Sequence, residues 1–574
     1  MYPKKQIYID ITMKIRNILF FFCILLFSFT KTYAQQAVNP RNTLIQQQTN
    51  PSQQRIPMTE NAQKLLMSLY YTSNLYVDET DEKKIVEDAI KGMLEKLDPH
   101  SEYSDAEETK ELTEPLESNF DGIGIQFNIL TDTLYVVQVI SGGPSEQIGL
   151  LAGDRIILVE DELIAGVGMK NTDIQKRLRG PRGTEVRIKV KRGGFTDLLE
   201  FKITRGRIPL YSLDAAYMID NKTGYIRLNR FAMSTIDEFR EAVDTLKGQG
   251  MENLILDLQS NGGGYLHVAN ELADDFLGKG QLIVYTQGSR QPRDDVFATE
   301  RGCFETGRVV IMVDESSASA SEILSGAVQD WDRGVILGRR TFGKGLVQRP
   351  IPLPDGSMIR LTTARYYTPS GRFIQKPYTA GNEREYSRDL IERYNRGEMM
   401  NADSIHFPDS LKHSTLISNR TVYGGGGIMP DVFIPIDTTR YTDFHRRISN
   451  LGLIVRTTMN YIDAKRTELN SMYTNFESFK HNFNVSEELL QELANLATEA
   501  KIEYNEEQFD KSKVQLRLHV KALIARDLFD MNEYHQIIND DNPSLKEAIR
   551  IINDPAEYNR ILVKQPDIQL TINN

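Results

Sequence analysis

The chain has 574 residues, of which 40% are hydrophobic and 26% are charged, and its formal net charge is −11. These fractions are typical of a globular protein and exclude collagenous, wholly disordered and multispanning membrane chains, while the length predicts several domains. The acidic balance lacks the basic surface that nucleic-acid binding needs. Two cysteines make no disulfide framework and eight histidines show no metal-ligand spacing, so we expect no metal and no other cofactor.

Residues 1–34 have the composition of a secretory signal peptide. Lys14 and Arg16 precede a run of apolar residues from Ile18 to Phe29, and small or polar residues follow up to Ala34. The run is shorter than the ~20 residues that a membrane-spanning helix needs, which favours a cleaved signal over an anchor. We expect cleavage after Ala34, export to the periplasm or cell envelope, and membrane contact only through an uncleaved signal segment.

Residues 35–57, with seven Gln and three Pro, cannot bury enough apolar surface to fold and are predicted to form a flexible linker. Loss of residues 1–34 would leave a mature chain of net charge −15 with Cys303 as its single cysteine, which cannot form an intrachain disulfide. No histidine-containing motif accompanies Cys303, and we interpret it as a half-buried residue and not as a nucleophile.

Apolar residues recur at helical spacing through residues 58–117 and predict an N-terminal helical region, whose second helix ends at Asp98-Pro99. The pattern then changes to short β runs separated by glycine turns, with one helical segment at Thr172–Leu178. Five or six strands and a helix in so short a stretch predict a small independent module over residues 118–206.

Strands and helices alternate in the next region, residues 207–440. The buried strand Leu254–Leu258 leads through a glycine turn to a helix, and the strand Arg308–Val313 leads through a Ser/Ala-rich turn to another. Nearly continuous apolar strands that alternate with helices predict an α/β core with parallel strands. Within this region residues 377–424 are polar and irregular, which indicates an insertion, and residues 441–574 are predicted to form a helical C-terminal region.

The densest chemical signal is Glu315-Ser-Ser-Ala-Ser-Ala-Ser-Glu322, at the predicted turn from a strand into a helix. Small residues there allow another backbone to approach, and the free N–H groups at the helix start can hold an oxyanion beside a serine. Serine is also an ordinary N-cap residue. The residues alone do not choose between Ser317, Ser319 and Ser321 as a nucleophile.

Two further features support catalysis at this edge of the sheet. Gly262-Gly-Gly264 follows a buried strand, where its N–H groups would face a ligand, and the sequence has no P-loop or dinucleotide-binding pattern. Lys344 lies between two glycines and is followed by Leu346-Val347, so that desolvation could prepare it as a base. No histidine lies at these strand ends, and His267, the nearest in sequence, is not expected to act as the base.

Together these segments resemble the C-terminal processing peptidases, or tail-specific proteases, of serine peptidase family S41. The lysine of Phe342-Gly-Lys-Gly-Leu-Val-Gln348 follows the middle serine of the Ser-Ala-Ser-Ala-Ser-Glu segment after 25 residues. Other segments agree in collinear order over about residues 60–437: Leu97-Asp-Pro-His-Ser101, Phe120-Asp-Gly-Ile-Gly-Ile125, Ala152-Gly-Asp-Arg-Ile156, Leu254-Ile-Leu-Asp-Leu258, Ala364-Arg-Tyr-Tyr-Thr-Pro-Ser-Gly371 and Gly427-Ile-Met-Pro-Asp431. The resemblance implies a crotonase- or ClpP-like α/β protease core with an inserted, mostly β PDZ domain and helical N- and C-terminal regions, the last outside the family's common core.

The resemblance implies that Ser319 is the nucleophile, Lys344 the general base and Gln348 the residue that orients this lysine. A lysine has an ordinary pKa of about 10.4, so base catalysis near pH 7 to 8 requires a pKa lowered by roughly 2–3 units. Desolvation can lower it if no carboxylate pairs with the ammonium, and Gln348 is a neutral partner. The implied oxyanion hole consists of the backbone N–H groups of Ala320 and of either Gly263 or Gly264.

Two departures from the family's common form leave open which glycine faces the oxyanion. Gly262 stands where Pro often follows the Asn, and Gln259 replaces a frequent Arg. Neither departure touches a catalytic side chain. Asp330 matches an acidic position of some members, and we interpret it as structural support.

The PDZ domain implied by the resemblance spans residues 118–206. Its loop of Gly122, Ile123, Gly124 and Ile125 is expected to hold a peptide C-terminus, because consecutive N–H groups form a nest for the carboxylate and the peptide pairs as an added strand. We therefore expect an exported serine endopeptidase that cleaves polypeptides near their C-termini with a Ser-Lys dyad and is gated by the PDZ domain. Expected partners are polypeptide C-termini and a second copy of the chain, bound through the helical regions.

Two other functions fit parts of the sequence. A non-catalytic PDZ adaptor or chaperone would keep the module with a relict core, but intact Ser319, Lys344 and Gln348 disfavour it. An acyl-CoA enzyme would share the crotonase-like architecture, but a PDZ module and export disfavour that function.

Overall fold

The computed structural model describes residues 58–130 and 132–563. The predicted signal peptide and linker, residues 1–57, lie outside the described residues. The chain divides into two compact units, one up to Glu87 and one from Asp88 onward.

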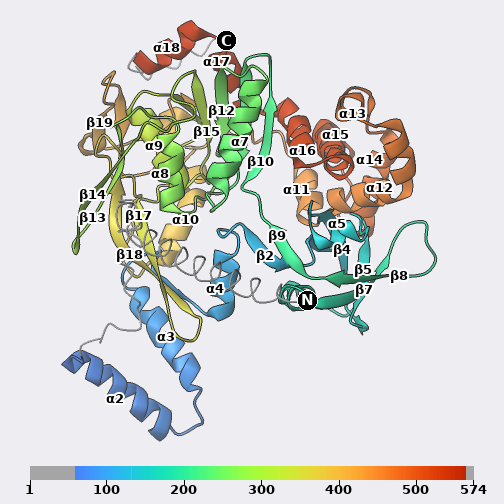
Figure 1. Ribbon diagram of the computed structural model, residues 1–574, viewed down its shortest axis with the longest axis horizontal. Coiled ribbons are helices and arrows are strands. Elements are labelled where there is room, and N and C mark those ends of the chain that lie inside the picture. Colours follow the sequence, from blue (N-terminus) through green and yellow to red (C-terminus); the bar gives the residue numbers. More distant parts are fainter. Residues whose placement is uncertain (1–57, 131, 564–574) are drawn as a thin grey trace, which may run out of the picture. The chain divides into compact units, whose positions relative to one another are not determined.

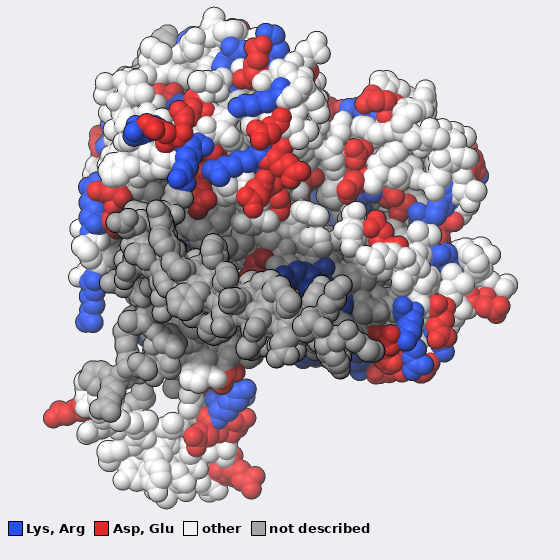
Figure 2. Space-filling view, viewed as in Figure 1, with Lys and Arg blue, Asp and Glu red and all other residues white. Residues whose placement is uncertain are grey.

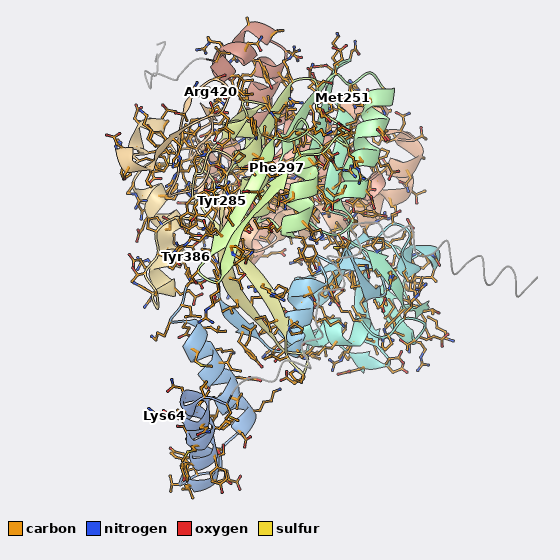
Figure 3. All side chains as sticks on the ribbon, turned by 60° about the vertical axis from the view of Figure 1, so that its left-hand side comes forward. Lys64, Met251, Tyr285, Phe297, Tyr386 and Arg420 are labelled. Carbon is orange, nitrogen blue, oxygen red and sulfur yellow. The ribbon has the colours of Figure 1, made fainter. Side chains whose placement is uncertain are left out.

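The first unit contains α2 (Glu60–Leu75) and the beginning of α3 (Glu82–Leu94). Thr59 caps α2, since its hydroxyl accepts the Ala62 N–H at 3.2 Å. No residue of α2 is buried, and Figure 3 labels Lys64 on this helix. A helix with apolar residues on an exposed surface needs a partner to cover them.

A six-stranded sheet forms the core of the second unit (Figure 1). β10 is antiparallel to β11 and every later neighbour is parallel, so the predicted α/β core with parallel strands is confirmed. Every residue of β12 and β15 is buried, as parallel strands covered on both faces require. In sheet order the strands are β10 (Leu213–Met218), β11 (Thr223–Leu228), β12 (Asn253–Asp257), β15 (Val309–Val313), β16 (Val335–Gly338) and β21 (Val432–Phe433).

Helices cover both faces of this sheet. α7 (Thr235–Gly248), α8 (Leu266–Asp274) and α9 (Ala320–Asp330) share one hydrophobic cluster with alternate strand residues. The other strand residues pack against α17 (Pro543–Ile552) and α18 (Pro555–Val563), so the last helices of the described chain complete the core of the sheet. The Tyr558 hydroxyl accepts the Val309 N–H at 3.0 Å and ties α18 to β15.

A second, antiparallel sheet lies beside the lysine motif. Its order is β1-β18-β13-β14, with β17 also paired to β18. Residues 58–117, predicted to form a helical region, also contain the strand β1, because a three-residue strand is too short to show a periodic pattern. Its members, with the helix that follows β1, are β1 (Glu102–Ser104), α4 (Ala106–Thr113), β13 (Leu282–Gly288), β14 (Gln291–Phe297), β17 (Leu346–Pro352) and β18 (Met358–Tyr367).

A small β module with its own hydrophobic core is inserted before the central sheet. β2 (Asn119–Gly122) pairs with β9 (Gly206–Pro209) where the chain enters and leaves it. In the module's sheet the order is β3-β4-β5-β7-β8, which leaves β3 as an edge strand. The remaining elements are β3 (Ile125–Leu130), β4 (Thr133–Val139), α5 (Pro144–Gln147), β5 (Arg155–Val159), β6 (Glu162–Leu163), α6 (Asn171–Leu178), β7 (Glu185–Lys191) and β8 (Leu199–Thr204).

Residues 377–424, expected to be irregular, contain a helix and a short hairpin. Arg420, labelled in Figure 3, pairs with Asp332 and Asp431 and ties this segment to the core. The regular elements here are α10 (Glu383–Asn395), two 3₁₀ turns (Ala402–Ser404 and Asp409–Leu411), β19 (Lys412–Ser414) and β20 (Thr421–Tyr423).

The C-terminal region is helical and contains a bundle with a separate hydrophobic cluster before α17. Its members are α11 (Asp443–Asn450), α12 (Leu453–Met472), α13 (Phe476–Asn482), α14 (Glu487–Glu499), α15 (Glu506–Leu528), α16 (Met531–Ile538) and a 3₁₀ turn (Asn539–Asp541). Among the helices of the described residues, none is long and apolar enough to cross a membrane. On the face that Figure 2 shows, basic and acidic side chains are intermixed.

Candidate active site

The serine-rich turn leaves one of its three candidate serines accessible. Ser317 and Ser321 are fully buried, and their hydroxyls donate to the carbonyls of Leu258 and Asn261 at 2.8 and 2.9 Å. Ser319 is partly exposed and lies at the start of α9 with φ of 56° and ψ of −111°. Such a backbone conformation is rare outside glycine and persists where the surroundings enforce it, often at active sites.

The carboxylate of Glu322 holds the serine turn and the lysine loop together. It is fully buried, and its Oε2 accepts the N–H groups of Ser319 and Lys344 at 2.8 and 2.9 Å. Its Oε1 accepts the Gly343 N–H at 2.7 Å and the Thr341 hydroxyl at 2.5 Å. Burial raises the pKa of Glu322, and these four donors oppose that rise. The sequence interpretation missed this role, although Ser-x-x-Glu is the pattern of a capping box.

Lys344 lies where two backbones approach closely. A Cβ on Gly343, whose φ is +88°, would lie 3.0 Å from the Gly427 nitrogen, and one on Gly345 would lie 2.8 Å from the Gln375 nitrogen. Desolvation lowers the pKa of Lys344 to about 8, with help from Arg360, while Glu102, Glu322 and Asp98 oppose the shift. This pKa is in the range that the resemblance requires for base catalysis near neutral pH.

The glycine turn lies directly against Ser319. A Cβ on Gly263 would be 2.9 Å from both the Ser319 Cβ and the Ala320 nitrogen. The Gly263 N–H already donates to the Asn261 side chain at 2.9 Å. Among the hydrogen bonds of the described residues, none engages the N–H of Gly264 or of Ala320, so these two are available for an oxyanion.

Gln348 lies on β17 at a register shift between β17 and β18. Its amide Nε2 donates to the Leu346 carbonyl at 3.2 Å and to the Thr362 hydroxyl at 3.3 Å. Within the described part of the chain no hydrogen bond joins Gln348 to Lys344, nor Lys344 to the Ser319 hydroxyl. The structure therefore brings the three predicted residues to one region without bonding their functional groups.

Tyr366 connects the second sheet to the serine turn and to the lysine loop. Its buried hydroxyl lies 2.6 Å from the Lys344 carbonyl and 3.2 Å from the Ser319 carbonyl. The Tyr366 hydroxyl therefore lies between the serine turn and the lysine loop, which Glu322 also joins.

His100 is a histidine near the lysine that the sequence interpretation did not single out. Burial and the Lys344 charge lower the pKa of His100 to about 4. Its Nε2 lies 2.9 Å from the hydroxyl of Tyr386, which Figure 3 labels. His267, by contrast, is exposed on α8. The Leu97–Ser101 segment, which carries His100, was the available signal.

The predicted peptide-binding loop precedes the edge strand of the β module. Gly122 ends β2, Ile125 begins β3, and Gly124 has φ of +81°. The carbonyls of Ile123 and Gly124 accept N–H groups of the module at 3.0 Å, which fixes the loop's backbone. An edge strand that follows such a loop can accept an added strand.

Among the described residues, Cys303 and Asp330 lie apart from the Ser319 turn in surroundings of their own. Burial raises the pKa of Cys303 to about 12, so its thiol stays protonated at neutral pH. Asp330, fully buried, pairs with Arg372 and supports the core. Among the described residues no group of three or more His, Cys, Asp or Glu side chains is arranged to hold a metal ion.

The sequence matches four family models. Peptidase family S41 matches residues 222–383, and a PDZ domain matches residues 122–203. The N-terminal domain of the activating protease CtpB matches residues 23–109, and a family of unknown function matches residues 444–530.

Known proteins resemble about half of the chain. A carboxy-terminal-processing protease of Bartonella bacilliformis is 37% identical over 305 residues, 52% of this chain and 69% of that protein. Carboxy-terminal processing protease CtpB of Bacillus subtilis is 34% identical over 309 residues, 53% of this chain and 63% of that protein. The solved photosystem II D1 C-terminal processing protease is 28% identical, with a TM-score of 0.31, over 55% of this chain and 90% of that one. The chain thus spans about two thirds of the length of the first two relatives.

Proposed function

Since the chain belongs to peptidase family S41, we propose that it is a serine endopeptidase with Ser319 as nucleophile and Lys344 as general base. One observation carries this proposal: the accessible, strained Ser319 is tied through buried Glu322 to the loop of a lysine whose pKa is about 8. A crotonase- or ClpP-like arrangement of the core is part of the proposal.

The reaction follows from these positions. Neutral Lys344 takes the proton of the Ser319 hydroxyl while the Ser319 oxygen attacks the substrate carbonyl carbon. The protonated lysine then gives this proton to the departing amine. Lys344 next takes a proton from the water that attacks the acyl-enzyme carbonyl, and returns it to the Ser319 oxygen as the bond between that oxygen and the acyl carbon breaks. The N–H groups of Gly264 and Ala320 would hold the oxyanion, each contributing about 3–4 kcal/mol. Gln348 would orient the lysine amine.

The PDZ domain would deliver the substrate. We assign Gly122, Ile123, Gly124 and Ile125 to the substrate's terminal carboxylate and β3 to its added strand, because β3 is an edge strand. The paired strands β2 and β9 form the module's connection to the core, and movement there would gate the active site. Cleavage near the C-terminus of a polypeptide follows from this delivery.

Export and self-association complete the proposal. The signal-like composition of residues 1–34 supports export to the periplasm or cell envelope. The exposed apolar side chains of α2 support a homodimer through this helix; they include Leu65, Leu66, Met67, Tyr70, Tyr71 and Leu75. Light scattering should find a dimer that becomes a monomer in the double variant Leu66→Ser/Tyr70→Ser but not in Lys64→Ser. An unchanged mass in the double variant would contradict this.

The test of function compares the mature protein with Ser319→Ala on an unfolded polypeptide, with fragments read by mass spectrometry. Each is given the substrate with a free and with an amidated C-terminus. We expect fragments from the native protein alone, and slower cleavage of the amidated substrate. Binding without cleavage would support a PDZ adaptor instead, and cleavage by Ser319→Ala would exclude this nucleophile.

A further inference from the structure

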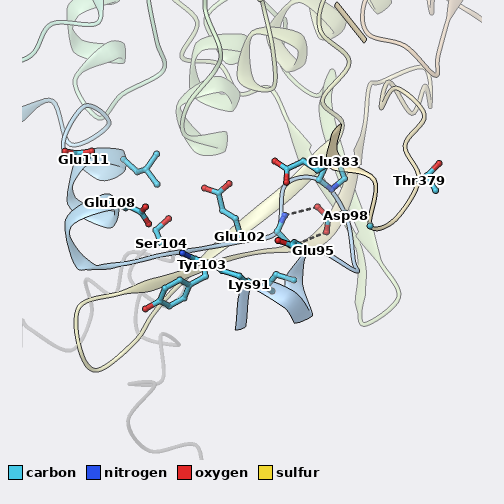
Figure 4. A pocket seen from close by; sticks show the side chains of 15 residues that line it. Lys91, Glu95, Asp98, Glu102, Tyr103, Ser104, Glu108, Glu111, Thr379 and Glu383 are labelled. Atoms are coloured by element: carbon cyan, nitrogen blue, oxygen red, sulfur yellow. Dashed lines mark hydrogen bonds between the residues drawn. The ribbon is translucent and has the colours of Figure 1, made fainter. Parts of the chain in front are cut away.

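The segment Leu97–Ser101 has a role that the dyad does not explain. Asp98 is buried and accepts hydrogen bonds from the N–H groups of His100 and Ser101, at 2.8 and 3.0 Å, and from the Ser101 hydroxyl at 2.6 Å. Figure 4 shows Asp98 on the wall of a cavity of about 620 Å³. A buried carboxylate that recruits this many donors fixes the groups around it.

One further donor to Asp98 comes from the sheet that carries Gln348. The Thr362 hydroxyl donates to Asp98 Oδ1 at 3.0 Å, and the Thr362 N–H donates to the Ser101 hydroxyl at 3.0 Å. β1 pairs with β18 directly beside this contact, with Glu102 opposite Arg360, so the segment is anchored to the sheet.

The direction of these bonds determines how the Gln348 amide must point. A hydroxyl has one proton, and Thr362 gives it to a carboxylate that cannot donate in return. Toward Gln348 the Thr362 oxygen can therefore only accept, which requires Nε2 at this position, 3.3 Å away. The Leu346 carbonyl, 3.2 Å from the same nitrogen, imposes the same orientation. Both constraints leave the carbonyl oxygen Oε1 on the free end of the amide.

We propose that Asp98 is a positioning residue for proteolysis, which acts through Thr362 to keep Gln348 Oε1 available to an N–H of Lys344. The proposal rests on the proposed function. On this side Oε1 accepts a hydrogen bond from an N–H of the neutral amine, which leaves the nitrogen lone pair free for the Ser319 hydroxyl. A reversed amide would donate to that lone pair and compete with the serine.

The test removes the hydroxyl that links Asp98 to Gln348. Thr362→Val should lower kcat about tenfold, the value of a typical hydrogen bond, and leave KM within about twofold. Thr362→Ser, which keeps the hydroxyl, should restore most of kcat. Thr363→Val changes the neighbouring threonine of the same strand, whose hydroxyl forms no hydrogen bond among the described residues, and should match the native protein.

A second arm ties the effect to Gln348. In a Gln348→Ala background, Thr362→Val should change kcat by less than about twofold, because the amide it orients is gone. Thr362→Ala is the second variant if the valine variant does not fold, and the same loss is expected. Rates are expressed per serine that reacts with a fluorophosphonate, so that unfolded protein does not count.

The possible results distinguish a failure of the positioning role from a failure of the proposed function. If the native protein cleaves and Ser319→Ala does not, but Thr362→Val cleaves normally, the positioning role is wrong and the proposed function stands. The positioning role would also be overturned if Thr362→Val lowered kcat equally in the native and the Gln348→Ala backgrounds, or if it changed KM alone. If the native protein does not cleave, both fall.

Discussion

Two regions hold the groups around Lys344, and they do so by different means. In the first, one fully buried carboxylate, Glu322, binds main-chain N–H groups of the serine turn and the lysine loop. In the second, Asp98 acts on Gln348 through the Thr362 hydroxyl, by side chains alone. Main-chain positions depend on the fold as a whole, whereas the orientation of an amide depends on a few protons. The first region therefore places the reacting atoms, and the second adjusts the base.

Glu322→Gln breaks the first region and should have the largest effect. In the native protein each oxygen of the Glu322 carboxylate accepts two hydrogen bonds. In the glutamine variant, either orientation of the amide replaces one of these oxygens by an NH₂ group, which faces two donors and cannot accept from them. We expect at least a 100-fold loss of cleavage and a free energy of unfolding lower by about 2–3 kcal/mol, the cost of unsatisfied buried groups. Urea unfolding and cleavage rates measure this. Glu271→Gln, on the exposed face of α8, is the matched control, and equal behaviour of the two variants would refute the role of Glu322.

Gln348→Glu changes the second region and should have an intermediate effect. A carboxylate favours the charged form of a neighbouring lysine and raises the pKa of Lys344, so less of the neutral base exists at pH 7.5. Cleavage there should fall at least about tenfold and recover as the pH is raised. The pH profile of kcat/KM measures this; full turnover at neutral pH would contradict the assignment of Gln348.

Tyr366→Phe tests where the two regions meet and should have the smallest effect. The variant loses the hydroxyl between the Lys344 and Ser319 carbonyls but keeps the ring. We expect stability lower by about 1 kcal/mol and cleavage slower by roughly threefold. Tyr367→Phe on the same strand controls for the substitution, since Tyr367 stacks on Tyr285 instead. A larger loss of cleavage in Tyr366→Phe than in Glu322→Gln would contradict the leading role given to Glu322.

Much of the fold could be predicted from local patterns. The apolar runs of β12 and β15 predicted parallel buried strands, and both are wholly buried. The helices after residue 441 were predicted, but periodicity does not say what a helix packs against. The packing of α17 and α18 on the central sheet could therefore not be predicted from the sequence.

The candidate site was predictable as motifs but not as contacts. The residues alone left Ser317, Ser319 and Ser321 open, and only the family resemblance pointed to Ser319. The burial of Ser317 and Ser321 now separates them from Ser319, and burial is not encoded in their shared motif. The pairing of Asp98 with Thr362 joins residues 264 positions apart, and no spacing rule reaches that far. The hydrogen bond from the Gly263 N–H to the Asn261 side chain, which leaves Gly264 as the proposed oxyanion donor, is likewise not visible in the sequence.

The central claim is that Lys344 activates Ser319, and labelling by a fluorophosphonate tests it most directly. Burial lowers the pKa of Lys344 most, and Arg360, Glu102, Glu322, Asp98 and His100 are among the charged or titratable groups of the described residues that act on it. Because the neutral amine is the base, the labelling rate should rise with pH through an apparent pKa of about 8, with Ser319 as the modified residue. Lys344→Met should abolish that rise. Label on Ser317 or Ser321, or a rate in Lys344→Met that follows the native pH profile, would contradict the account.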